Sequence, residues 1–175
     1  MMSDFGHRLP LDRIRDGDRL DLVADADERA AVAARLDLPS LARLDAHAVL
    51  RRDGDIVHAS GRVKGSLEQR CAATGDPLPV HVDEAFDLRF VPAPQLSGGD
   101  EEFELEAGDL DTLFHDGQAI DLGAAIADSL ALGLDPYPRG AQAEQVLRQA
   151  GVVSEDEARP YSALSALKGM LDKGV

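Results

Sequence analysis

The chain has a single cysteine, Cys71, and a thiolate can serve as a nucleophile or as a metal ligand. A reactive thiolate needs a nearby cation, a helix N-terminus or a base, and the adjacent Arg70 points to the opposite face of a strand. Zinc takes about four ligands, and one cysteine with scattered histidines does not supply the usual spacing. The sequence therefore predicts a small packed cysteine, without metal, cofactor or intramolecular disulfide.

The histidines offer two further possibilities for chemistry. His47 and His58 could form half of a transition-metal site, but no third ligand follows them, so surface histidines that titrate near neutral pH are the favoured interpretation. His115-Asp116 could be an oriented base, yet the glycine after it favours a hydrogen-bonded turn. The sequence contains no phosphate-binding loop, dinucleotide fingerprint, nucleophile elbow or paired-histidine helix motif. These observations predict a protein without catalytic residues.

A group of carboxylates keeps one enzymatic alternative open. Asp109, Asp111, Asp116 and Asp121 are close in sequence, and hard cations such as Mg²⁺ take oxygen ligands. A metal-dependent RNA-processing hydrolase is therefore the first alternative function. A general protein-interaction module is the second.

Acidic residues are concentrated in the second half of the chain. The formal net charge is −15, and residues 71–175 hold 6 Lys or Arg against 20 Asp or Glu. Seven of the twelve residues from Asp100 to Asp111 are acids. Such a field repels phosphate backbones and attracts basic proteins, so no DNA partner is expected. This acidic strip is either a solvated edge or a docking site for a basic partner, with the candidate residues Glu101, Glu102, Glu104 and Glu106.

Length and hydropathy predict one soluble domain followed by a tail. The chain has 175 residues, of which 44% are hydrophobic, enough for one core of ordinary size. We expect a core domain over residues 1–140 and a helical tail over residues 141–175. The N-terminus, MMSDFGHRLPLDR, has no apolar signal core, and no segment is long enough to cross a membrane. A cytoplasmic protein without a membrane partner is expected.

A β-hairpin is expected to position the main cluster of basic residues. Alternating small apolar residues flank Asp53-Gly54, a common two-residue turn, which would set Leu50 opposite Val57 and Asp45 opposite Arg62. The other face of the hairpin would carry His47, His58 and the candidate RNA-contacting residues Arg43, Arg51, Arg62 and Lys64. A solvated face partly neutralised by Asp45 is the alternative.

The remaining elements predict an α+β fold. A strand within PVHVDEAFDLRFVP alternates, with Val80, Val82, Phe86, Leu88 and Phe90 on one face. Helices are expected over residues 25–36, capped by Asp25 or Asp27, and over residues 122–134, capped by Asp121. We expect an antiparallel sheet or partly closed barrel with packed helices and a helical C-terminal tail. In that tail Tyr161, Leu164, Leu167 and Leu171 form an apolar stripe that must cover the domain or a partner.

Three stretches together resemble the YceD family of large ribosomal RNA subunit accumulation proteins. "CAAT" with "FDLRF" corresponds to a Cys-x-x-Cys before an F-x-L-x-F strand, "IDLGAAIADSLALGLDPYP" to a helix ending near x-P-x-x-P, and "PYSALSALK" to the final signature. The resemblance implies a bacterial, non-enzymatic protein that supports accumulation of 23S ribosomal RNA. It implies as partner a protein or assembly factor of the large subunit, or 23S ribosomal RNA itself.

Two departures from the family pattern concern metal binding. Thr74 stands where the second cysteine of Cys-x-x-Cys is expected, and RGAQAEQ replaces a cysteine-rich knuckle that some members carry after x-P-x-x-P. A zinc role therefore does not carry over to this chain. Cys71 resembles the surviving half of a pair.

Overall fold

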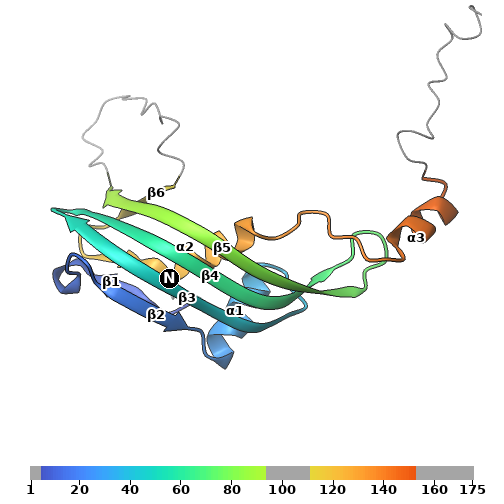
Figure 1. Ribbon diagram of the computed structural model, residues 1–175, viewed down its shortest axis with the longest axis horizontal. Coiled ribbons are helices and arrows are strands. Elements are labelled where there is room, and N and C mark those ends of the chain that lie inside the picture. The colour runs from blue at the N-terminus through green and yellow to red at the C-terminus, as the bar shows by residue number, and fades with distance from the viewer. Residues whose placement is uncertain (1–4, 94–110, 153–175) are drawn as a thin grey trace, which may run out of the picture.

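The computed structural model describes residues 5–93 and 111–152 of the chain (Figure 1). The strands are β1 (Arg8–Pro10), β2 (Arg19–Val23), β3 (Ser40–Asp53), β4 (Ile56–Arg70), β5 (Pro77–Pro92), β6 (Thr112–His115) and β7 (Ala119–Asp121). The helices are a 3-10 turn (Leu11–Arg13), α1 (Ala26–Arg35), α2 (Leu122–Leu132) and α3 (Ala143–Gln149). The predicted tail stripe from Tyr161 to Leu171 and the acidic residues Glu101 to Glu106 lie outside the described residues.

A five-stranded sheet forms the body of the molecule. Its strand order is β2-β3-β4-β5-β6, and neighbouring strands are antiparallel except for the parallel pair β5–β6. β1 and β7 form a separate antiparallel pair. The described sheets are not closed into a barrel, and α2 lies behind the long strands in Figure 1. The predicted α+β class is confirmed, with an open and mostly antiparallel sheet.

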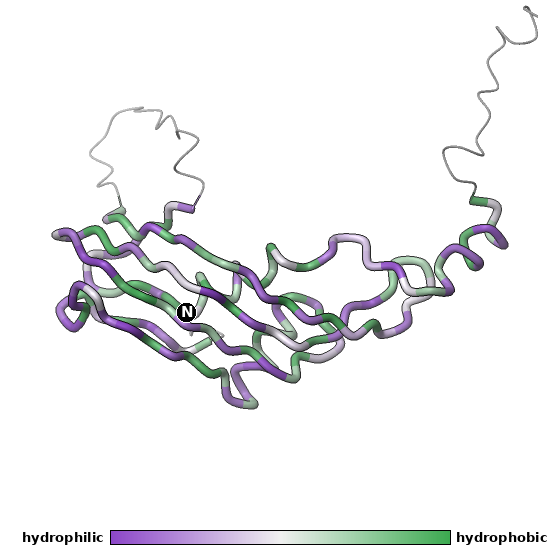
Figure 2. The backbone as a smooth tube through the Cα atoms, viewed as in Figure 1, coloured by the Kyte–Doolittle hydropathy of each residue, from purple (hydrophilic) through white to green (hydrophobic). Residues whose placement is uncertain are grey.

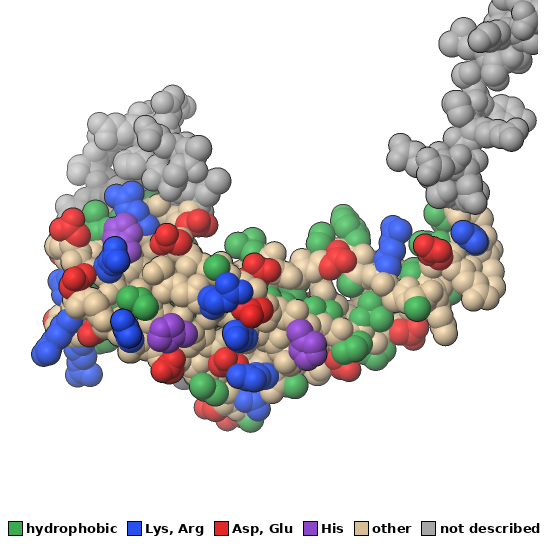
Figure 3. Space-filling view, viewed as in Figure 1, with side chains coloured by type: hydrophobic (Ala, Val, Ile, Leu, Met, Phe, Trp, Pro, Cys, Tyr) green, Lys and Arg blue, Asp and Glu red, His purple; other side chains and the backbone are tan. Residues whose placement is uncertain are grey.

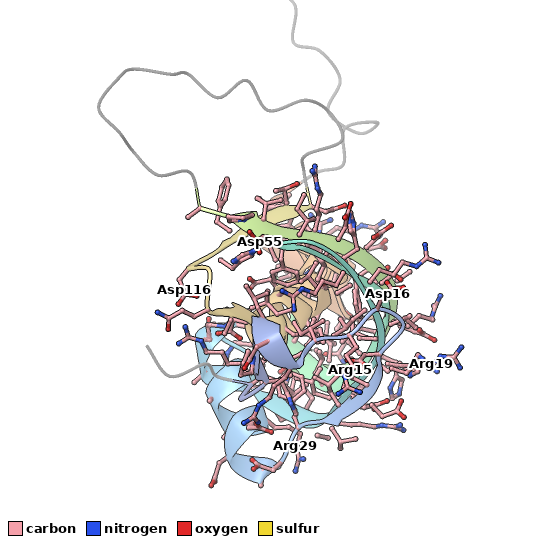
Figure 4. The ribbon with its side chains drawn as sticks, turned by 90° about the vertical axis from the view of Figure 1, so that its left-hand side faces the viewer. Arg15, Asp16, Arg19, Arg29, Asp55 and Asp116 are labelled. Atoms are coloured by element: carbon pink, nitrogen blue, oxygen red, sulfur yellow. The ribbon has the colours of Figure 1, made fainter. Side chains whose placement is uncertain are left out.

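The inner face of this sheet and α2 build the core. Alternate residues of the long strands are buried, and Leu50, Val57 and Val63 are each at most 1% exposed. Figure 2 shows hydrophilic and hydrophobic residues alternating along these strands. Ile126 and Leu130 of α2 are fully buried. Figure 4, which looks onto the end that carries Asp55 and Asp116, shows the sheet curving around these inner side chains.

Two glycines of β4 give the core its close packing. A Cβ on Gly61 would lie 1.9 Å from the backbone oxygen of His47 and 2.9 Å from the ring of Phe86. A Cβ on Gly65 would lie 2.7 Å from Cδ1 of Leu130. Because β4 has no side chain at these two positions of its inner face, Phe86 and the helix residue Leu130 can pack directly against its backbone.

The turn of the β3–β4 hairpin differs from the prediction. Asp53 pairs with Ile56, so Gly54 and Asp55 form the turn instead of Asp53-Gly54. Gly54 has a φ of 60°, the conformation required at the first central position of a turn that starts with glycine. The predicted register was therefore wrong, since Leu50 pairs with Ala59 and Asp45 with Lys64. Each residue meets a partner two positions further along, so the predicted faces are kept.

Both predicted helix caps are present. The Asp25 side chain accepts hydrogen bonds from the amides of Asp27 and Glu28, and Glu28 accepts one from the Asp25 amide, which completes a capping box for α1. The Asp121 side chain accepts from the Ala124 amide at the start of α2. α2 ends at Leu132, two residues before the predicted end. α3 lies at the opposite end of the sheet from β6 (Figure 1).

Candidate functional site

The outer face of the sheet carries the predicted basic residues. Arg43, His47, Arg51, His58, Arg62 and Lys64 are all exposed, as expected from the alternation of β3 and β4. Figure 3 shows this face with basic, acidic and histidine side chains intermixed over the strands. The face is therefore mixed in charge and not uniformly basic.

Three of the four candidate RNA-contacting residues are held by carboxylates. Nε of Arg62 donates to Oδ1 of Asp83 at 2.8 Å, and Nζ of Lys64 lies 3.7 Å from Oδ2 of the same side chain. Arg43 pairs with Asp45. The hydrogen bond from Arg62 lowers the pKa of Asp83 below that of a free aspartate. The predicted pairing of Asp45 with Arg62 was therefore wrong, because the acid beside Arg62 comes from β5.

The fourth candidate, Arg51, lies in a different environment. It is the cross-strand neighbour of His58, which in turn is the cross-strand neighbour of Arg89. Among the residues that the structure describes, no carboxylate forms an ion pair with Arg51 or His58. This row places two arginines and a histidine side by side on neighbouring strands.

A shallow hollow lies beside the paired cations. It has a volume of about 440 Å³ and is lined by residues of β2, β3 and β4 that include Val23, Arg43, His47 and Arg62. Nδ1 of His47 is 2.8 Å from Oδ1 of Asp21 at its margin. Basic and acidic groups alternate around the hollow, so it offers no concentrated charge to a ligand.

Cys71 is buried, as predicted, and its sulfur accepts a hydrogen bond. It is 3% exposed, and the amide of Gly140 donates to Sγ at 3.4 Å. This hydrogen bond, with that of the Thr74 side chain next in size, lowers the pKa of the Cys71 thiol to about 7. The contact with Gly140 could not be predicted from the sequence, since the two residues are 69 positions apart.

Two of the clustered carboxylates, Asp116 and Asp121, have structural partners. Asp116 accepts from the amides of Gln118 and Ala119 and pairs with Arg8 at 2.6 Å, and the amide of Gln118 is the main reason that its pKa is lowered. Asp121 caps α2. Asp109 lies outside the described residues. Over residues 5–93 and 111–152, no group of three or more His, Cys, Asp or Glu side chains could hold a metal ion.

His115 and its neighbours form the predicted turn. Nδ1 of His115 accepts from the amide of Gly117 at 3.0 Å, and Nε2 is 2.7 Å from the carbonyl oxygen of Asp55. The ring is 5% exposed. Since Nδ1 accepts, Nε2 carries the proton and donates to Asp55, which joins β6 to the hairpin turn.

Sequence reasoning missed a groove beside β5. It has a volume of about 190 Å³ and lies between that strand and the end of α2. Its lining includes Glu84, Phe86, Asp87, Asp111 and Leu132. In the sequence the only indication of this groove is Glu84, an acid at a position where the alternation of β5 predicts an apolar residue.

Comparison with protein families matches residues 59–168, more than half of the chain, to the family described as large ribosomal RNA subunit accumulation protein YceD. The chain belongs to the YceD family. The match runs from β4 through α3 and includes Arg62, Lys64 and Asp83, whereas Arg43 and Arg51 precede it. The family description implies involvement in accumulation of large-subunit ribosomal RNA.

The other comparisons add no relative. Comparison with curated proteins and with solved structures gives no match. None of the helices that the structure describes has the length and apolar character needed to span a lipid bilayer.

Proposed function

We propose that this YceD-family protein is a non-enzymatic, cytoplasmic bacterial factor that supports accumulation of 23S ribosomal RNA by binding a protein of the large ribosomal subunit or an assembly factor of that subunit. Its effect on the RNA would then be indirect. Neither DNA nor a membrane is a partner in this proposal.

The pairing of Arg62 and Lys64 with Asp83 is the observation that most favours a protein over RNA as the partner. Phosphate contacts require cations that are free to replace condensed counterions. Here the cations near the centre of the outer face already have carboxylate partners. The net charge of −15 repels RNA at long range and attracts basic proteins, which favours a basic protein of the ribosome.

Direct contact with 23S ribosomal RNA is the second candidate, and the row of Arg51, His58 and Arg89 favours it. The row places two guanidinium groups and an imidazole on neighbouring strands. Salt would weaken such a contact steeply through counterion release.

Co-sedimentation with precursors of the large subunit separates the two candidates. One variant reverses charge with Arg51→Glu and Arg62→Glu, and the other neutralises Glu101, Glu102, Glu104 and Glu106 to glutamine. If the proposal holds, the variant with four glutamines no longer co-sediments, and the variant with Arg51→Glu and Arg62→Glu still does. A control with Asp12→Asn and Asp53→Asn changes exposed acids elsewhere. The reverse pattern would favour direct RNA contact.

The hydrolase alternative has its own test. Purified protein is incubated with precursor ribosomal RNA and Mg²⁺ or Mn²⁺, and the RNA is examined for cleavage. The proposal expects intact RNA. Metal-dependent cleavage that disappears in an Asp111→Asn variant would make the protein an enzyme.

A further inference from the structure

Among the residues that the structure describes, no strand pairs with the outer edge of β5 over most of its length. β6 pairs only with Arg89–Pro92, so in the described sheet the edge from Pro77 to Leu88 meets no other strand. In Figure 1, β5 forms the upper margin of the sheet and β6 lies beside only one end of it. An unpaired edge presents N–H and C=O groups that can bind an additional strand.

Backbone hydrogen bonds show which residues of β5 point to this edge. The amides of Arg89 and Ala93 donate to the carbonyl oxygens of Asp111 and His115 on the β6 side. Successive residues of an antiparallel strand alternate in direction, and the β4–β5 register has no bulge. The backbone groups of Ala85 and Asp87 therefore point to the same side, next to the groove.

One end of the edge is already closed to pairing. Pro79 has the same parity as Ala85 and Asp87, so it faces the edge without an amide hydrogen to donate. Prolines on edge strands commonly prevent unwanted pairing. The part of the edge that can bind another strand is therefore residues 81–88, beside the groove.

The groove supplies an apolar contact for an added strand. Phe86 and Leu88 line its floor, and Leu132, at the end of α2, is 84% exposed. A Cβ on Gly133 would lie 2.6 Å from Cγ of Glu84, so glycine allows the helix end to approach β5 closely. Every second side chain of an added strand would point toward this apolar surface.

The charges around the groove favour a basic partner. Glu84, Asp87 and Asp111 line it, and none of them forms an ion pair with a described residue. The chain's own strip from Asp100 to Asp111 is acidic, so it would bring like charges to these carboxylates. Lys or Arg side chains of a partner would be attracted to these carboxylates.

We propose that the open edge of β5 binds an extended segment of a basic protein as an added strand. Apolar side chains on one face of the segment lie over Phe86 and Leu132, and the Lys or Arg side chains on its other face lie beside Asp87. This inference rests on the proposed function in identifying the partner as a basic protein, and it adds the binding mode.

Fluorescent peptides and the full-length purified protein test the binding mode. The probe is a short peptide that alternates valine and lysine, and the controls alternate valine and glutamate or carry N-methyl groups on alternate amides. The lysine peptide is expected to bind, and methylation of the amides that face β5 is expected to weaken binding about tenfold or more. The glutamate peptide is expected not to bind.

Two variants at one position test the backbone edge. Ala85→Pro removes an outward amide hydrogen without removing a bond to β4, whereas Ala85→Thr keeps that amide. Binding should be lost in the first and kept in the second, with thermal melting as the check on folding. If Ala85→Pro does not fold, the Asp87→Lys variant tests the proposal instead. Its affinity for the lysine peptide is expected to be about fivefold weaker than that of the wild type, whereas the control Asp53→Lys is expected to bind with unchanged affinity.

Several results would overturn the proposal. These are no binding of the lysine peptide, equal binding of the N-methylated peptide, or unchanged binding by Asp87→Lys. Slow hydrogen exchange at the amides of Ala85 and Asp87 in the peptide-free protein would show that its own chain covers the edge, which also overturns it. Because these measurements use purified protein, a negative result leaves co-sedimentation with ribosomal precursors as a separate test of the proposed function.

Discussion

Arg62 and Asp83 are joined across the β4–β5 pair, with Nε of the arginine donating to Oδ1 of the aspartate at 2.8 Å. The same carboxylate lies 3.7 Å from Nζ of Lys64. A single acid from β5 therefore holds two of the cations that the sequence placed on the hairpin face. This arrangement decides how the outer face presents its charge.

Replacing Asp83 with asparagine should make the outer face bind RNA. Asp83→Asn frees Arg62 and Lys64 for phosphate contacts, so affinity for a single-stranded RNA at low salt should rise, and the slope of log K against log salt should steepen by about 0.7 per additional contact. Fluorescence anisotropy measures both quantities. Asp53→Asn gives the same net charge without freeing a cation, and equal RNA affinity in the two variants would show that the pairing does not restrain these cations.

Replacing Gly61 with alanine should destabilise the domain strongly. The added Cβ would lie 1.9 Å from a backbone oxygen of β3, which cannot move without disturbing the hairpin. We expect a loss of about 1–3 kcal/mol or more in the free energy of unfolding, measured by urea denaturation. Ser60→Ala, at an exposed position of the same strand, should change little. A stable Gly61→Ala variant would contradict the close approach of β3 and Phe86 to this residue.

The contribution of Cys71 to stability should depend on pH. Its pKa is lowered to about 7 in the folded protein from an ordinary value of 9.0, so the folded state releases the proton more readily than the unfolded state. The stabilisation is therefore complete at a pH above the pKa of the thiol in the unfolded state, and it is lost as the pH falls through about 7. The stability difference between the wild type and Cys71→Ala, measured by urea denaturation in reducing buffer, should grow from about pH 6 to about pH 9. A difference that stays constant with pH would contradict the hydrogen-bonded thiolate.

Deletion of residues 160–175 should show what the predicted tail helix covers. Its stripe of Tyr161, Leu164, Leu167 and Leu171 stays a prediction from spacing, and the binding account expects it to contact a partner. Thermal melting should then be unchanged while co-sedimentation with ribosomal precursors is lost. A lower melting temperature with binding retained would show that the tail packs on its own domain.

The faces of the long strands could be predicted from the sequence because alternation alone determines them. Leu44, Leu50 and Val63 fell on the buried side even though the predicted turn was displaced, since a displacement by two positions keeps parity. The caps at Asp25 and Asp121 could be predicted for a similar reason, because each acts on amides within three residues.

Contacts between distant strands could not be predicted in this way. The pairing of Arg62 with Asp83 depends on the register of β5 against β4, and the connection from Cys71 to Asp76 is too long to fix that register as a two-residue turn would. The hydrogen bond from Gly140 to Cys71 depends on the path of the chain after α2. The groove beside β5 arises because β6 is short and parallel, which alternation does not reveal.

Affinity capture from bacterial lysate, with and without ribonuclease, shows whether the protein acts on ribosomal RNA through a protein partner. The account predicts that the tagged full-length protein captures one or more proteins of the large ribosomal subunit or its assembly factors, identified by mass spectrometry, and that capture survives ribonuclease. It also predicts weaker capture as salt rises, because the contact is between an acidic surface and a basic partner. Complete loss of ribosomal proteins after ribonuclease treatment would contradict it and would make the protein an RNA-binding factor.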